Sequence, residues 1–529
     1  MRYLTLFTIG PVQGFIAQAR KLQDLYAGSF LLSYLAKQTM AKAQKLGADI
    51  LFPDPEQESA PNRFLMMWEV GNEYALCEIC RELDKYVRGE WEDIARKVIK
   101  ETKFTYTGAI SAQISSLIQV YYASELYKGD ESFGECYKNV MKRLGAAKTF
   151  RTFTQLDEPP GRKCSVSYEH NAIFYRDDPN NPNKKKSYLV PNANKVTGYN
   201  VGDLNKYIQP DETLGAVTFV KRCLRFAIPE FNDNFPPVSD IYKMYGNKLD
   251  EDDDKHGYYA VVMFDGDNMG LWYSEPDIHC MSKIREFQAY LSGKISEFAA
   301  LKSYAIVDWE KRQNGVVVYA GGEDFLGVLN LQSAFSTLCE LRKAFGEIDI
   351  SAYTDKKLTF SAGIVIAHIK TPLSEVLGKV REAEHKAKTF YSNKKDAYCL
   401  TIIRHNGEMT EFIQPFYYDD TASLEILDTL VETLVCDGIS PKFIFQLGEE
   451  LARIAETSQS KLHKEIFLVE ARRLIENSEF TDIEQKEAIV EKIYGKLELL
   501  AKSTEFDLKN LLMFLRGIAF IARERGAEQ

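Results

Sequence analysis

The chain has 529 residues, of which 45% are hydrophobic and 27% charged, and its formal net charge is −10 at pH 7. This length exceeds what one hydrophobic core supports, so about three or four domains are expected. The acidic balance argues against a surface built for bulk nucleic-acid binding. No signal peptide begins at Met1, no apolar run reaches membrane-spanning length, and nine cysteines are scattered, so we expect a reduced cytoplasmic protein without a membrane partner.

The first 150 residues predict an alternation of strands and helices. In order, the expected elements are a strand over 2–9, a helical region that starts near 12 and runs past 35 with a break at 27–29, strands over 49–52 and 63–70, and a helix over 74–100. The order β-α-β-β-α is the beginning of a ferredoxin-like unit. We therefore predict a palm-like domain over residues 1–150.

From residue 151 to residue 255 the sequence is turn-rich, polar and weakly periodic, as at Pro159-Pro160-Gly161. These features predict an irregular inserted module. The run Lys184-Lys185-Lys186 is expected to be a solvated loop, and a contact with RNA phosphate is the alternative.

Residues 256–410 repeat the first pattern more clearly. The expected elements are strands over 258–264, 316–319, 325–329, 358–367 and 398–403, and helices over 282–300, 333–345 and 373–390. They predict a second βαββαβ palm with an additional strand, in which residues 262–267 correspond to residues 5–10 of the first copy. Because the first copy lacks carboxylates at these positions, we expect it to be structural.

Residues 411–529 are helical by their period and are predicted to form a docking domain. The predicted fold class is α+β multidomain, with two ferredoxin-like palm domains, an irregular insert and a C-terminal helical domain.

The stretch Tyr319-Ala320-Gly321-Gly322-Glu323-Asp324-Phe325 follows one apolar run, begins another, and predicts a β-hairpin with two acids at its tip. Its glycines let the backbone turn tightly and approach a ligand closely. The upstream apolar run 258–264 ends in Asp265-Gly266-Asp267-Asn268. Two strands that present carboxylates at neighbouring ends are typical of a two-metal nucleotidyl-transfer site. The alternative is that both stretches are ordinary turns.

We predict two Mg²⁺ or Mn²⁺ ions at Asp265, the Gly266 carbonyl, Glu323 and Asp324, and a catalytic role for the three acids. A triphosphate also needs cations; Lys388 is the first candidate and Lys386 the second. The other residues predicted to contact the nucleotide are Gly266, Asp267, Asn268, Gly321, Gly322, Ser361, Ala362 and Gly363. The small residues at 361–363 leave room for a base or ribose, and close strand packing is the alternative.

These residues resemble the large subunit of type III-B CRISPR effector complexes, the palm polymerase/cyclase family. The blocks that carry the resemblance are Ile9-Gly10-Pro11-Val12-Gln13-Gly14-Phe15-Ile16, Pro61-Asn62-Arg63-Phe64, Phe264-Asp265-Gly266-Asp267-Asn268-Met269-Gly270, Val318-Tyr319-Ala320-Gly321-Gly322-Glu323-Asp324, Ser361-Ala362-Gly363-Ile364 and Ala383-Glu384-His385-Lys386-Ala387-Lys388. The helical end matches the family only in kind.

The resemblance implies that the chain joins sister subunits around a CRISPR guide RNA. It also implies that pairing of target RNA with the guide activates the palm to polymerise ATP into cyclic oligoadenylate, a second messenger in antiviral defence. Some relatives instead join AMP to S-adenosylmethionine, which is the alternative activity. An ATP-binding scaffold without turnover and a free-standing diguanylate cyclase are further alternatives. The intact carboxylates disfavour the scaffold, and the block Gly10-Pro11-Val12-Gln13 disfavours the diguanylate cyclase.

The sequence departs from the family pattern in three places. Glu323 stands where relatives usually carry the first of two aspartates, which leaves the metal or product preference open. The chain starts at the first palm, so DNA cleavage by an N-terminal His-Asp nuclease domain is not expected. Relatives often bind zinc with two Cys-x-x-Cys pairs in the insert, whereas Cys164 is followed by Ser167, so zinc is not expected. The isolated pair Cys77 and Cys80 lies on a predicted helix face, which favours buried thiols.

Overall fold

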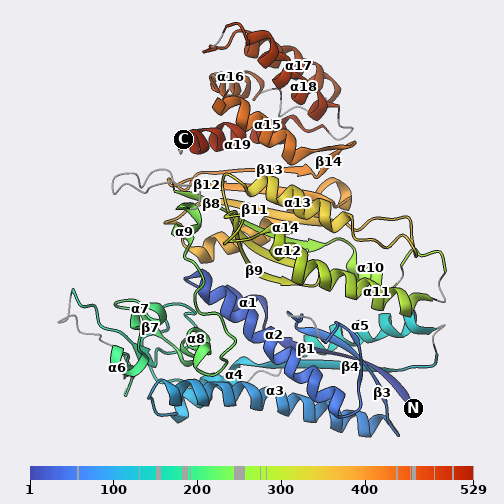
Figure 1. Cartoon of the computed structure of the whole chain (residues 1–529), viewed down its shortest axis with the longest axis vertical. Coiled ribbons are helices and arrows are strands. Elements are labelled where there is room, and N and C mark those ends of the chain that lie inside the picture. The colour runs from blue at the N-terminus through green and yellow to red at the C-terminus, as the bar shows by residue number, and fades with distance from the viewer. Residues whose placement is uncertain are drawn as a thin grey trace. The chain divides into compact units, whose positions relative to one another are not determined.

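The computed structural model describes the chain except for residues 56–58, 130–131, 151–155, 181–188, 191, 244–256, 275, 281–282, 437–438, 453, 455–459, 482, 503–505 and 528–529. The lysine run 184–186 and the predicted boundary at residues 255 and 256 therefore lie outside the described residues. The chain forms two compact units (Figure 1). The first combines Met1–Pro237, Asn268–Ala300 and Asp349–Lys356; the second combines Val238–Asp267, Leu301–Ile348 and Lys357–Gln529.

The first unit is built on a four-stranded antiparallel sheet. Its strands are β1 (Arg2–Gly10), β2 (Asp49–Phe52), β3 (Arg63–Glu69) and β4 (Gln119–Leu126), in the order β2-β3-β1-β4. The long helices are α2 (Leu22–Lys45), α3 (Glu73–Glu101) and α5 (Phe133–Thr149). Together they give the predicted βαββαβ order with α5 added, and α5 packs on β4 and β1.

Shorter elements complete the first unit. They are α1 (Gln13–Ala17), α4 (Gly108–Leu117), β5 (Phe174–Tyr175), β6 (Asn194–Lys195), α6 (Gly198–Val201), α7 (Leu204–Tyr207), β7 (Thr213–Leu214), α8 (Ala216–Arg222), η2 (Leu224–Phe226), α10 (Met269–Ser274) and α11 (Ile284–Glu297). The insert is thus held by a small sheet of two-residue strands, in the order β6-β5-β7. We predicted the helix α11 as part of the second palm, whereas it groups with the first unit, where it packs on α5 and β2.

The predicted helix break at residues 27–29 is wrong, because α2 runs through these residues without interruption. The break lies instead between α1 and α2. A Cβ atom at Gly28 would approach Lys221 Cε to 2.9 Å. The small residue at this position therefore serves close packing against a buried side chain rather than a turn.

A buried ionic network fastens α2 to the insert. The Arg222 guanidinium donates to Asp24 at 2.7 Å and to Glu212 at 2.6 Å, and all three side chains are at most 2% exposed. The neighbouring Lys221 ammonium donates to the Phe15 carbonyl at 2.8 Å. Burial lowers the pKa of Lys221 to about 7. The insert is thus tied to the first palm by paired charges in a dry environment.

The second unit is built on a six-stranded sheet. In spatial order its strands are β13 (Met409–Pro415), β12 (Ala397–Ile403), β11 (Phe360–His368), β8 (Tyr258–Gly266), β10 (Asp324–Asn330) and β9 (Gly315–Gly321). Only the β11–β12 pair is parallel. The helix α14 (Leu373–Asn393) covers β8, β11 and β12. The helix α13 (Ala334–Gly346) connects β10 to β11 along the chain. The strands predicted for this palm are confirmed.

The remaining elements are mostly helices after the sheet. They are α9 (Val238–Lys243), the π-helical segment η4 (Phe298–Lys302), α12 (Ser303–Ile306), β14 (Tyr417–Tyr418), β15 (Thr421–Ala422), α15 (Ser423–Cys436), α16 (Lys442–Leu451), α17 (Ser460–Glu476), α18 (Lys486–Ala501) and α19 (Leu508–Ala527). An ion pair of 2.6 Å between Arg525 and Asp428 joins α19 to α15. In the part of the chain that the structure describes, every helix is too short or too polar to cross a membrane.

Candidate active site

The β9–β10 hairpin places its two acids at the end of β8, as predicted. Gly322 has φ of 69°, a conformation that a side chain disfavours, and it makes the two-residue turn. Asp324 lies directly opposite Asp265 in the β10–β8 register. The Gly266 amide donates to the Glu323 carbonyl at 3.2 Å, which closes the end of the ladder. The structure therefore brings Asp265, Glu323 and Asp324 to one edge of the sheet.

Aromatic packing beneath the acids makes this edge rigid. The Phe264 ring stacks on Phe325, with centroids 4.7 Å apart, and on Phe360, with centroids 3.8 Å apart. Each of these residues directly precedes or follows a site residue in its strand. Stacked aromatic cores hold neighbouring strands in one register. The carboxylates are thus presented by a frame with little freedom to adjust.

The electrostatics of the pair favour a bound cation. The pKa of Asp324 is raised well above its usual range by loss of water around the carboxyl group, then by its hydrogen bond with Asp265 and by repulsion from Asp265 and Glu323. Because Asp324 is exposed, repulsion from the neighbouring carboxylates is the main cause of this rise in its pKa. Among the described residues, no group of three or more His, Cys, Asp or Glu side chains is gathered as a metal site. Asp265 and Asp324 nonetheless fit a divalent cation, because it would relieve the repulsion between the two carboxylates. The cation would gain its further ligands from a phosphate.

Lys388 of α14 reaches this edge, as predicted. Its ammonium pairs with the Asp265 carboxylate and with Glu384, whose Oε1 atom is 2.5 Å away. Burial alone would lower the pKa of Lys388, but the attraction of Asp265 and Glu384 outweighs it and raises the pKa to about 12. Lys388 is therefore a permanent positive charge beside the acids.

Several residues predicted to contact the nucleotide have partners within the protein. Asp267 is 2% exposed and accepts hydrogen bonds from Thr359 Oγ1 at 2.8 Å, Ser361 Oγ at 2.8 Å and the Asp396 amide at 3.0 Å. Both carboxylate oxygens of Asp267 thus accept hydrogen bonds within the protein, and the Ser361 hydroxyl donates its proton to one of them. We therefore assign Asp267 and Ser361 to holding the loops behind the site.

The small residues of β11 are packing positions rather than room for a base. Ala362 is fully buried. A Cβ atom at Gly363 would lie 2.2 Å from the Val380 carbonyl oxygen and 2.5 Å from the Glu384 amide nitrogen. The backbone of α14 thus fills the space over Gly363. Of the two alternatives, close packing is the one that the structure favours.

Two other candidates also take different roles. Lys386 points to β13, where it pairs with Glu411 at 2.5 Å, because residues two apart on a helix face different directions. Asn268 belongs to the first unit and adopts φ of 57°. Its carbonyl accepts from the Leu271 and Trp272 amides at 2.8 and 3.1 Å, so it begins α10.

Two residues of the site carried no role in our prediction. Glu384 is the second partner of Lys388 and lies four residues earlier on α14. The i,i+4 spacing of an acid and a lysine is the sequence signal for this pair. Tyr319 is the other: a Cβ atom at Gly321 would lie 2.1 Å from the Tyr319 hydroxyl oxygen. The Tyr319 ring therefore covers Gly321 and occupies the space that a side chain at this position would need. Residues two apart in a strand lie on one face, and this spacing is the sequence signal for the contact.

The first palm repeats the frame without the acids. Thr8 lies opposite Arg63 in the β1–β3 register, as Asp265 lies opposite Asp324. The Ile9 amide donates to the Asn62 carbonyl at 2.9 Å, which matches the Gly266–Glu323 bond. Phe7 and Phe64 stack at 5.1 Å, like their counterparts in the second palm. The predicted correspondence of residues 5–10 with 262–267 is confirmed.

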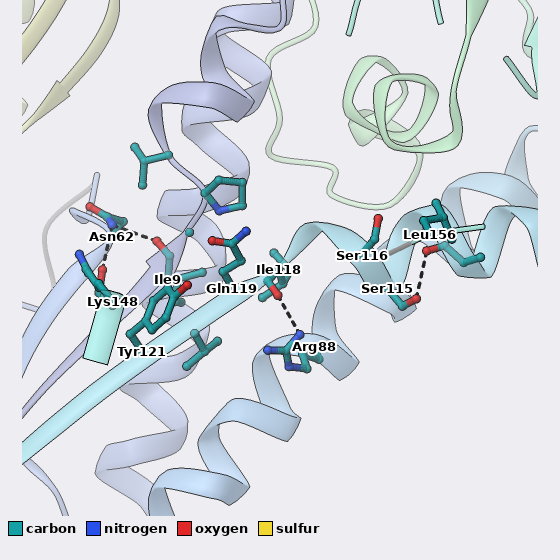
Figure 2. Close-up of a pocket in the computed structure, with 16 residues that line it drawn as sticks. Ile9, Asn62, Arg88, Ser115, Ser116, Ile118, Gln119, Tyr121, Lys148 and Leu156 are labelled. Atoms are coloured by element: carbon teal, nitrogen blue, oxygen red, sulfur yellow. Dashed lines mark hydrogen bonds between the residues drawn. The ribbon is translucent and has the colours of Figure 1, made fainter. Parts of the chain in front are cut away.

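A cavity of about 920 Å³ opens at this edge of the first palm. Figure 2 shows Asn62 directed toward the Ile9 carbonyl, at 2.9 Å, and Arg88 directed toward the Ile118 carbonyl, at 2.7 Å. Arg88 and Lys148 are the charged side chains among its described lining residues, which include no acid. The carboxylate ligands that a divalent cation prefers are therefore missing from this edge.

The fold and site define a protein with two palm domains, of which the second carries a paired-carboxylate edge. Residues 4–68 match the family described as CRISPR-associated protein Cmr2, N-terminal, and residues 258–399 match Cas10/Cmr2, second palm domain. In both stretches the chain is similar to the large subunits of type III-B CRISPR effector complexes.

Individual relatives cover nearly the whole chain at low identity. The CRISPR system Cmr subunit Cmr2 of Pyrococcus furiosus is 22% identical, over 98% of this chain and 72% of its own length. A chain of the type III-B Cmr-beta complex matches in its apo state with a TM-score of 0.67 and 12% identity, covering 98% of this chain and 82% of that one. A chain of the same complex bound to cognate target RNA matches with a TM-score of 0.67 and 13% identity, covering 98% of this chain and 83% of that one. These structures show that the fold is shared.

Proposed function

We propose that this large subunit transfers AMP units from ATP in a two-metal reaction, activated by target RNA, and produces cyclic oligoadenylate. The single observation that carries the proposal is the register pairing of Asp265 with Asp324 at the end of a rigid sheet, beside a permanently charged lysine. Catalysis of phosphoryl transfer consists mainly of positioning the substrate and stabilising its charge. Carboxylates that bind metal ions and a lysine that binds phosphate are therefore sufficient side chains for it.

Each residue has a part in this reaction. Asp265 and Asp324 hold the ions, with the Gly266 carbonyl and Glu323 as further ligands. Two bound Mg²⁺ or Mn²⁺ ions would supply Lewis-acid stabilisation of the charge on the transferred phosphate. Lys388 binds the polyphosphate, and Gly322, beside which there is open space, lets the chain approach the nucleotide. The attacking hydroxyl comes from a second nucleotide, so no protein nucleophile is needed.

The expected partners follow from the family. A Cmr2 relative is a subunit of a Cmr system, and the Cmr-beta complex has been seen with cognate target RNA. These relatives support sister subunits and target RNA as partners of this chain, and we propose a guide RNA that pairs with the target as a further partner. Its formal charge of −10 agrees with RNA held by an assembly rather than by this subunit alone.

The experiment uses the assembled complex with ATP and Mg²⁺ or Mn²⁺, with and without matched target RNA and S-adenosylmethionine, and reads the products by mass spectrometry. Asp265→Asn and Asp324→Asn are the test variants. Asp420→Asn is the matched control, because Asp420 is exposed in the turn between β14 and β15.

Target-dependent oligoadenylate that disappears in both test variants and persists in the control supports the proposal. An AMP adduct that forms only with S-adenosylmethionine would replace the oligoadenylate product by the conjugate. If ATP is not consumed under any condition, the chain is a scaffold and the proposal fails.

A further inference from the structure

Glu384 is a second acidic partner of Lys388 that the proposed reaction leaves without a role. Its carboxylate oxygen is 2.5 Å from the Lys388 ammonium, and its side chain is only 16% exposed. The same ammonium contacts Asp265, whose side chain is 33% exposed. One lysine is thus shared between a carboxylate at the metal edge and a more buried carboxylate on its own helix.

The helix that carries both residues packs closely on the sheet. The backbone at Val380 and Glu384 lies directly on Gly363 of β11, where even a methyl group would clash. The lysine side chain, by contrast, is a flexible four-carbon stem. Loss of the Asp265 contact, with the Glu384 contact kept, therefore requires rotation of one side chain and no displacement of α14.

A divalent cation at Asp265 competes with Lys388 for the same carboxylate, and the two positive charges repel each other. A half-buried ammonium left without any carboxylate partner is costly. Resting on the proposed function, we infer that Glu384 is a positioning residue that retains Lys388 when a divalent cation binds Asp265 and displaces the lysine from it. Glu384 thereby keeps the lysine fixed beside the site and lowers the metal concentration that the site requires.

The test measures Mn²⁺ binding to the assembled complex without ATP, from the electron paramagnetic resonance signal of free Mn²⁺. The binding that is lost in Asp265→Asn defines the site. Glu384→Gln is expected to raise the half-saturating Mn²⁺ concentration by about three- to tenfold, the range for loss of one half-buried ion pair. Glu382→Gln is the matched control, because Glu382 lies on the same helix, is 56% exposed and pairs with Lys379.

A double-variant cycle separates positioning from mere stability. In a Lys388→Gln background the competing ammonium is gone, so Glu384→Gln should change Mn²⁺ affinity by less than about twofold. A rise in the half-saturating concentration that persists in this background overturns the inference, because Glu384 would then act through the fold. An unchanged affinity in Glu384→Gln also overturns it, while leaving the proposed function intact. If the unmodified complex shows no Asp265-dependent binding, both fail.

Discussion

Gly363→Ala should damage the second palm although it adds only one methyl group. The added Cβ atom would lie 2.2 Å from the Val380 carbonyl oxygen and 2.5 Å from the Glu384 amide nitrogen. Both are backbone atoms of α14, so no rotamer change can relieve the contact. Because nonbonded heavy atoms pack at about 3.5 Å, the helix must move away from β11 by about 1 Å.

This displacement has a cost that can be estimated. Overpacking a well-filled core destabilises by about 2 kcal/mol. For a cooperative unit of roughly 250 residues, such a loss lowers the melting temperature by about 4–8 °C. The displaced helix also carries Lys388 away from Asp265, so target-dependent nucleotide transfer should fall together with stability.

Differential scanning calorimetry, with hydrogen exchange of α14 to identify the transition, measures the effect. Gly378→Ala is the matched control: it lies on the same helix, and its Cβ would meet nothing within 4 Å. Alanine in a helix is better than glycine by about 0.5–1 kcal/mol, so the control should be slightly more stable. A Gly363→Ala protein as stable as the wild type would refute the packing argument and restore β11 as the wall of a base pocket.

Two other predictions concern the first palm and the hairpin. Lys221→Met should flatten the pH dependence of the first unit: the pKa of Lys221, about 7 when folded, lies below its unfolded value, so the wild type gains stability as pH rises from about 7 to about 10. Melting temperatures of both proteins across that range measure it, and equal slopes would contradict the assignment. Gly321→Ala should weaken Mn²⁺ binding because its methyl group meets the Tyr319 ring, and Tyr319→Ala in the same chain should restore it. A double variant as weak as the single one would show that the ring is not the obstacle.

The strands and the acidic hairpin could be predicted because their signals are local. Apolar runs of strand length, a glycine turn and acids at strand ends specify β8, β9 and β10 without knowledge of distant residues. The choice between Lys388 and Lys386 was also local: residues two apart on a helix face different directions, and Glu384 is four residues from Lys388. The spacing of Glu384 and Lys388 alone therefore favours Lys388 over Lys386 as the lysine at the acidic edge.

The roles of Gly363, Asp267 and Gly28 could not be predicted, because each depends on a partner far along the chain. Gly363 is small so that α14 can lie on it, and Gly28 is small so that Lys221 can reach across α2. Asp267 is held by a serine and a threonine more than ninety residues away. A glycine or an acid beside a motif looks the same whether it serves the ligand or the packing, and only the tertiary contacts separate the two.

The two palms together show which features the fold requires and which it does not. Both keep the stacked phenylalanines and the amide–carbonyl bond that closes the edge, but the first palm pairs Thr8 with Arg63 where the second pairs Asp265 with Asp324. The frame therefore forms without acids at these positions. Two carboxylates placed opposite each other repel and weaken the metal-free state. The strand frame does not need Asp265 and Asp324, and their repulsion destabilises it. Binding of a divalent cation is the best explanation for this pair of carboxylates.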